Sequence, residues 1–165
     1  MRFKLLSLFT NLLIFITFTY SSFAESINFN GLVISDFWIK STIGNHKITS
    51  GYLTIKNTSN IDERLVSLTS EISKKTQLHD MFVENDIMKM KNLTDGIVIK
   101  AKSKVTFKPG SYHIMFMKLQ KPLIVMNTYK VIIKFENSGS VILKMPVYRK
   151  KTKKHHHHWV LYLKY

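Results

Sequence analysis

The sequence predicts an all-β fold, a single-domain sandwich or barrel, on three observations. Short runs rich in Val, Ile, Phe, Tyr and Thr recur along the chain, and clusters of turn residues separate them at fairly regular spacing. No run sustains the periodicity of an amphipathic helix. At 165 residues, 45% of them hydrophobic, the chain is long enough for one domain with an ordinary buried core.

The predicted strands are runs of β-branched and aromatic residues, several of which alternate apolar with polar positions as a half-buried strand does. In chain order they cover residues 32–40, 51–56, 64–70, 75–82, 87–90, 96–99, 104–108, 112–118, 129–136 and 140–148.

Turn residues separate these runs at three clear places, residues 57–60, 108–111 and 137–139. Pro109 fixes φ in the second of these turns, and glycine in the second and third tolerates a positive φ. The second and third turns are expected to be hairpin connections.

The first 24 residues predict a signal peptide. Arg2 and Lys4 precede an apolar run over residues 5–18, and small residues ending at Ala24 form a cleavage site. A membrane anchor is the alternative, but this run is shorter than the roughly 20 residues that span a bilayer. We therefore expect cleavage after Ala24 and export to the periplasm, with a β-domain over residues 25–148.

Composition excludes several classes of chemistry. The chain has no cysteine, so it has no thiol redox centre, cysteine nucleophile, zinc thiolate site or blue-copper site. Its formal charge is +15, but the lysines before the tail are scattered singly, and an exported protein seldom meets nucleic acid. Nucleic-acid binding is therefore not expected. The charge is better explained by solubility, or by weak attraction to anionic lipid headgroups or to an acidic partner.

Residues 149–165 form a basic tail that is predicted to be disordered. Because the tail contains four consecutive histidines, it could instead be an expression tag, although tags usually end a chain and seven residues follow the last of these histidines. Four consecutive histidines in it are candidate ligands of an accessory Cu(II) site: His155, His156, His157 and His158.

Histidines and methionines recur at i, i+2 on three predicted strands. Alternation places each such pair on one face of its strand, with side chains about 7 Å apart. Ile114 and Phe116 supply the core face of their strand, so packing does not explain the opposite face. The pairs are His79 with Met81, Met88 with Met90, and His113 with Met115, which Met117 continues.

Thioether and imidazole ligands together favour a soft monovalent ion. Thioethers are neutral and polarisable and suit Cu(I), and neutral imidazole accepts copper readily. A methionine on a strand is more often core filler, and a lone histidine is more often structural, so the prediction rests on the set rather than on any one residue.

The spacing His79-x10-Met90-x22-His113-x-Met115 resembles the pattern of the PCu(A)C family of periplasmic copper chaperones. Segments such as "SGYLTIKNTSN", "TQLHDM" and "FKPGSYHIMFMKLQKPL" are also similar, and the likeness covers roughly residues 34–147. The resemblance implies a cupredoxin-like Greek-key β-sandwich and four Cu(I) ligands, His79, Met90, His113 and Met115. Three further methionines lie near these positions and are candidates to surround the four ligands or to capture the ion: Met81, Met88 and Met117.

The resemblance also implies a function without catalysis. A monomeric chaperone would accept Cu(I) and deliver it to the CuA subunit of cytochrome c oxidase, alongside a Sco-type thiol protein. Copper storage or sensing without delivery is one alternative. A copper redox enzyme is another, although such enzymes usually need more histidine than the His46, His79 and His113 that precede the tail.

Overall fold

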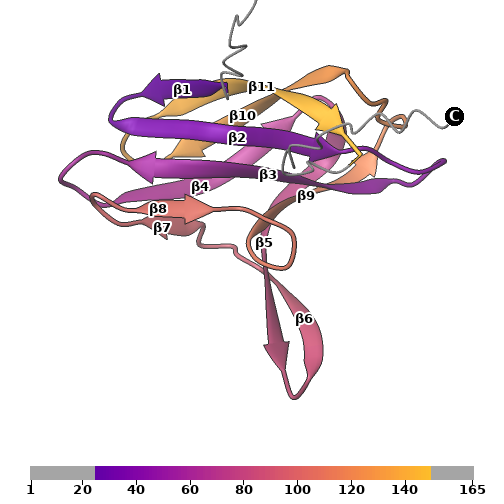
Figure 1. Ribbon diagram of the computed structural model, residues 1–165, viewed down its shortest axis with the longest axis horizontal. Coiled ribbons are helices and arrows are strands. Elements are labelled where there is room, and N and C mark those ends of the chain that lie inside the picture. Colours follow the sequence, from indigo (N-terminus) through magenta and orange to yellow (C-terminus); the bar gives the residue numbers. More distant parts are fainter. Residues whose placement is uncertain (1–24, 150–165) are drawn as a thin grey trace, which may run out of the picture.

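The computed structural model describes residues 25–149, and its regular elements there are all β-strands (Figure 1). No helix in this range could span a membrane. The predicted signal peptide and all of the tail beyond Arg149 lie outside the described residues. The strands are β1 (Ser26–Phe29), β2 (Leu32–Lys40), β3 (Ile48–Asn57), β4 (Glu63–Ser70), β5 (Ser73–Glu84), β6 (Ile87–Asn92), β7 (Ile97–Ile99), β8 (Lys104–Thr106), β9 (His113–Leu119), β10 (Thr128–Phe135) and β11 (Ser140–Tyr148).

The strands pair in the order β6-β5-β9-β3-β2-β11-β10-β4-β7, with β1 on β2 and β8 on β3. All pairs are antiparallel except β2 with β11, where Val147 lies opposite Ile39 and Tyr148 opposite Lys40. This short parallel pairing joins the half that contains β5, β9, β3 and β2 to the half that contains β11, β10, β4 and β7. The prediction of an all-β sandwich is confirmed.

Alternation along the strands builds the core between the two halves. On β9, Ile114 and Phe116 are fully buried, and they pack in one cluster with residues such as Val131 and Leu143 from the other half. Met145 on β11 is also fully buried, so this methionine is core filler. Because side chains alternate, the burial of Ile114 and Phe116 turns His113, Met115 and Met117 to the opposite face of β9.

One strand and one connection differ from the sequence prediction. The strand β1 was not expected. Residues 108–111 were expected to join a hairpin, but β8 and β9 do not pair with each other. Both pair with β3, β8 near its C-terminal end and β9 near its N-terminal end, so they lie end to end. The loop between them therefore folds back on itself, and the Lys108 amide donates to the Tyr112 carbonyl.

The β5–β6 hairpin projects from the sandwich (Figure 1). The first part of β5, up to His79, pairs with β9, and the part from His79 to Glu84 pairs with β6. The turn at its tip holds Asn85 at φ 52° and Asp86 at φ 59°. Two successive residues with positive φ are the geometry of a type I′ turn, whose twist matches that of the two strands it joins.

Candidate metal site

Three of the four candidate ligands come together where β5, β6 and β9 adjoin, and the fourth, Met115, lies on the same face. His79 on β5 lies directly opposite His113 on β9, and their ring centroids are 5.6 Å apart in a T-shaped arrangement. The pairing places both imidazoles on the face of the sheet that points away from the main core. Two histidines that lie 34 residues apart in the sequence are thereby brought side by side.

Met90 comes to the same point from β6. Its sulfur lies 2.9 Å from Nδ1 of His79, and the residue is 47% exposed. The other ring nitrogen of His79, Nε2, lies 3.3 Å from Oε1 of Gln77. Since Oε1 can only accept, a hydrogen bond there places the ring hydrogen on Nε2. In that tautomer the lone pair of Nδ1 faces the sulfur of Met90.

His113 is held in one orientation by the loop that precedes it. The residue is 3% exposed, and its Nδ1 lies 3.0 Å from the backbone carbonyl oxygen of Ser111. A carbonyl can only accept, so Nδ1 donates and Nε2 keeps its lone pair. Such a contact fixes the tautomer that a metal-binding histidine needs.

Met115 lies two residues beyond His113 on the same face of β9, and the register sets it opposite Gln77. Its side chain is partly exposed. The strand pairing therefore gathers His79, Met90, His113 and Met115 on one face at the meeting of three strands.

The surroundings favour the neutral form of His79. Burial lowers its pKa below the ordinary 6.5, and the nearby charges of His113 and Lys75 lower it further. A neutral imidazole keeps the lone pair with which it binds a metal ion. Residues 25–149 contain no group of three or more His, Asp or Glu side chains placed to hold a metal ion. The four candidate ligands themselves offer only imidazole nitrogen and thioether sulfur as donors.

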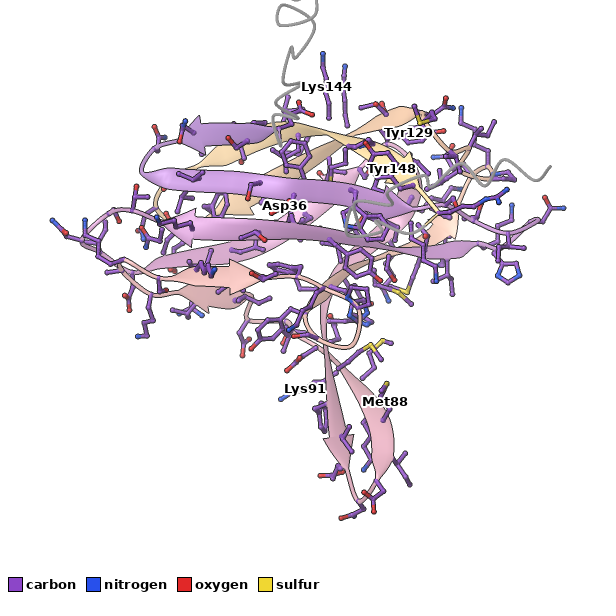
Figure 2. The ribbon with its side chains drawn as sticks, in the orientation of Figure 1. Asp36, Met88, Lys91, Tyr129, Lys144 and Tyr148 are labelled. Carbon is purple, nitrogen blue, oxygen red and sulfur yellow. The ribbon has the colours of Figure 1, made fainter. Side chains whose placement is uncertain are left out.

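The other three methionines lie on the same face but on two sides of this point. Met81 is opposite Met90, and Met88 is two residues nearer the hairpin turn. Figure 2 shows Met88 on the projecting hairpin. Met117 lies on the far side, opposite Lys75 on β5. The histidines of the tail, at positions 155–158, fall outside the described residues.

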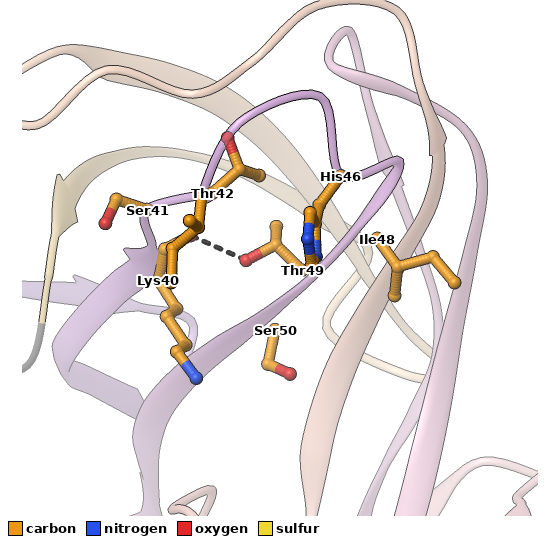
Figure 3. A pocket seen from close by; sticks show the side chains of 8 residues that line it. Lys40, Ser41, Thr42, His46, Ile48, Thr49 and Ser50 are labelled. Atoms are coloured by element: carbon orange, nitrogen blue, oxygen red, sulfur yellow. Dashed lines mark hydrogen bonds between the residues drawn. The ribbon is translucent and has the colours of Figure 1, made fainter.

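The remaining histidine of the domain, His46, lies elsewhere. It lines a pocket in the loop between β2 and β3 (Figure 3), where Thr49 Oγ1 donates a hydrogen bond of 2.6 Å to the Lys40 carbonyl. Since Ile48 is opposite Met117, His46 lies beyond the Met117 end of the face. Two polar partners at the site, Gln77 and Ser111, were not predicted from the sequence. Gln77 could have been found, because it stands at i−2 from His79.

The fold is that of the PCuAC domains. The copper-bound PCuAC domain from PmoF2 superimposes with a TM-score of 0.66 at 19% identity, over 76% of this chain and 99% of that domain. The Cu(I) form of DR1885 from Deinococcus radiodurans gives a TM-score of 0.57 at 19% identity, over 79% of this chain and 85% of that one. The predicted cupredoxin-like sandwich of the PCu(A)C type is therefore confirmed.

The chain belongs to the family described as "Putative lipoprotein LpqE-like", whose pattern matches residues 32–147. A relative from Leifsonia xyli subsp. xyli, also named a "Putative lipoprotein", is 28% identical over 118 residues, which is 72% of this chain and 70% of the relative. A Rickettsia prowazekii protein is 26% identical over 113 residues, 67% of this chain and 62% of that protein.

Proposed function

We propose that this protein binds Cu(I) through His79, Met90, His113 and Met115 and transfers it to another protein. The observation that carries the proposal is the 2.9 Å approach of His79 Nδ1 to the Met90 sulfur, with the His113 ring beside them. Nitrogen and sulfur donors from three strands lie on one face of the sheet, which supports the proposal, and all are uncharged. This donor set suits Cu(I) better than zinc, calcium or magnesium.

Related structures support copper as the cargo. The PmoF2 domain is described as copper-bound, and DR1885 was solved with Cu(I), and both share this fold. The names of the family and of the Leifsonia xyli relative describe lipoproteins, which are exported. A periplasmic protein that accepts and releases copper fits both comparisons.

Exposure of the thioethers supports transfer rather than permanent retention. Met90 is half exposed and Met115 is partly exposed, whereas His113 is buried and oriented by Ser111. Incoming thiolates can therefore replace Met90 and Met115 first and the histidines last, by associative ligand exchange. The recipient that we propose is the CuA subunit of cytochrome c oxidase, with a Sco-type thiol protein acting alongside. No bond of an organic substrate is made or broken in this role.

Competition with a chromophoric Cu(I) chelator under anaerobic conditions tests the binding site. We expect Met90→Leu, Met115→Leu and His113→Ala each to weaken Cu(I) binding by about tenfold or more, since even outer-shell changes cost about 10- to 100-fold. Met145→Leu, in the buried core, and Met126→Leu, 78% exposed on the loop before β10, are the matched controls. Equal losses in the controls and the site variants would refute the assignment.

A second measurement separates delivery from storage. The loaded protein is mixed with the apo form of a soluble CuA domain, and copper is followed in both proteins after rapid separation. Transfer within minutes supports the chaperone role. Retention of copper despite an excess of acceptor would instead favour sequestration.

A further inference from the structure

One face of the β5–β6 hairpin is made of thioethers and one valine. The register sets Met81 directly opposite Met90 and Val83 directly opposite Met88. Direct cross-strand partners have Cβ atoms about 5 Å apart, and positions two apart on one strand are about 7 Å apart. Methionine has three rotatable bonds between Cα and its terminal methyl group, so three sulfurs at these positions can reach one ion.

Packing does not account for Met88 and Met90. Met88 is 62% exposed and Met90 47%, on a hairpin that projects from the sandwich (Figures 1 and 2). Methionine in a protein core fills gaps, as the fully buried Met145 does. On the hairpin, the thioethers of Met88 and Met90 are instead open to solvent and to an arriving ion.

The thioether face is continuous with the site described above, because Met90 belongs to both. Its sulfur already lies 2.9 Å from His79 Nδ1. An ion held by Met81, Met88 and Met90 can keep its bond to Met90 while His79 and His113 replace the other two sulfurs. The ion then moves from the hairpin to the histidines without being released.

Charge favours arrival from the hairpin over arrival from the Met117 end. Residues 80–91 carry three carboxylates and two lysines, although the whole chain carries +15. At the opposite end Met117 faces Lys75, whose charge contributes to lowering the pKa of His79. A cation therefore meets less repulsion along the hairpin than along β9.

The turn fixes this alignment. Asn85 and Asp86 both have positive φ, which Asn and Asp tolerate, and the resulting two-residue turn sets the register of the strands. Because β5 is held by its pairing with β9, a shift of one residue in the register of β6 would turn Met88 and Met90 to the opposite face of the hairpin.

We propose that Met81 and Met88, with Met90, form a second Cu(I) site at which the ion enters before it reaches His79 and His113. This site rests on the proposed function, since it feeds the same four ligands. It has only thioether donors, so it binds more weakly than the mixed site and fills after it at equilibrium.

Methionine methyl resonances test the proposal. The full chain, labelled with 13C at the methionine methyl groups, is titrated with Cu(I) under anaerobic conditions to two equivalents. We expect Met90 and Met115 to shift with the first equivalent. Because Met90 is then bound to the first ion, the second equivalent should shift Met81 and Met88, with the Met90 sulfur bridging the two ions, while Met126 stays in place. Static Met81 and Met88 resonances, with Met90 and Met115 shifting, would overturn the second site and leave the proposed function standing. Static Met90 and Met115 resonances would overturn the proposed function itself.

Stopped-flow uptake gives an independent readout. The paired change Met81→Leu with Met88→Leu keeps side-chain volume and removes two sulfurs. We expect Cu(I) uptake from a weak chelate to slow by about tenfold, the factor that corresponds to 1.4 kcal/mol in a barrier. Met126→Leu is the control for an exposed methionine. Unchanged uptake in the paired variant would also overturn the entry site.

Discussion

The substitution Gly51→Ala should disturb the packing behind the site. Gly51 on β3 lies opposite Ile114 on β9, and a Cβ added to it would come within 2.7 Å of Cε2 of Phe116. Phe116 is fully buried and stands between Met115 and Met117 in the sequence of β9. Because the ring is fully buried, we expect the strain of the close contact to fall on the β3–β9 pairing.

The size of the effect follows from the close contact. Adding a methylene to a well-packed core lowers the free energy of unfolding by about 1 to 3 kcal/mol. Because the contact is shorter than van der Waals separation, we expect Gly51→Ala to lower it by about 2 kcal/mol. Phe116→Leu alone loses part of a buried ring and should cost about 1 to 2 kcal/mol, less than the ~3 to 5 of a change to alanine. The double variant should recover at least about 1 kcal/mol of the summed loss, because leucine leaves room for the new methyl group.

Urea denaturation of the wild type, the two single variants and the double variant measures this coupling, provided that the free energy of unfolding depends on urea concentration with the same slope in all four proteins. Cu(I) affinity, measured in parallel, should fall in Gly51→Ala and recover in the double variant if β9 carries the ligands. Additive losses in the double variant would refute the reasoning, since they would show that Phe116 does not fill the space above Gly51.

Three other predictions concern the fold around the site. Burial alone would raise the pKa of Glu63, but hydrogen bonds from Ser138 and from nearby backbone amides lower this pKa below 4.5. The ionised Glu63 therefore stabilises the fold above pH 4.5, and this contribution disappears as the pH falls through the lowered pKa. The urea midpoints of wild type and Glu63→Gln should therefore converge in acid, and a constant gap would contradict this. Gly96→Ala, at φ 75°, would drive a Cβ into the Leu65 carbonyl oxygen and should cost about 3 kcal/mol or more of unfolding free energy in the same assay. Asp86→Gly should favour the type I′ turn and slow amide hydrogen exchange in β6, and faster exchange would contradict the assigned turn.

The strand faces could be predicted from the sequence, because a period of two needs no knowledge of the partner strand. Alternation alone separated Ile114 and Phe116 from His113 and Met115. Ile114 and Phe116 are fully buried and Met115 is partly exposed, but His113 is buried as well, although it lies on the face opposite the main core. The opposition of His79 and His113 could not be predicted in this way. It depends on the register between β5 and β9, which is set by packing across the sandwich rather than by either sequence. The four-ligand assignment rested on resemblance and stays a prediction.

Two misses have local causes. Asn30 and Gly31, at φ 44° and 80°, form the turn between β1 and β2, and the Asn-Gly signal for a two-residue hairpin was present in the sequence. The Pro109-Gly110 loop carried an equally good turn signal, but it connects two strands that both pair with β3. Turn residues show where the chain bends and do not show which strand it meets next.

Met90 lies on the projecting hairpin, whereas His113 and Met115 lie on β9 within the sandwich. His79 lies at the junction, and the turn is six residues further along β5, about 20 Å at roughly 3.3 Å per residue. Met90 sits opposite Met81, only two residues beyond the junction, so tilting the arm by about 10° displaces it by about 1 Å relative to His113. A partner that binds the turn at the end of the hairpin would therefore change the distance between the Met90 sulfur and the ring nitrogens of His113 without contacting either residue.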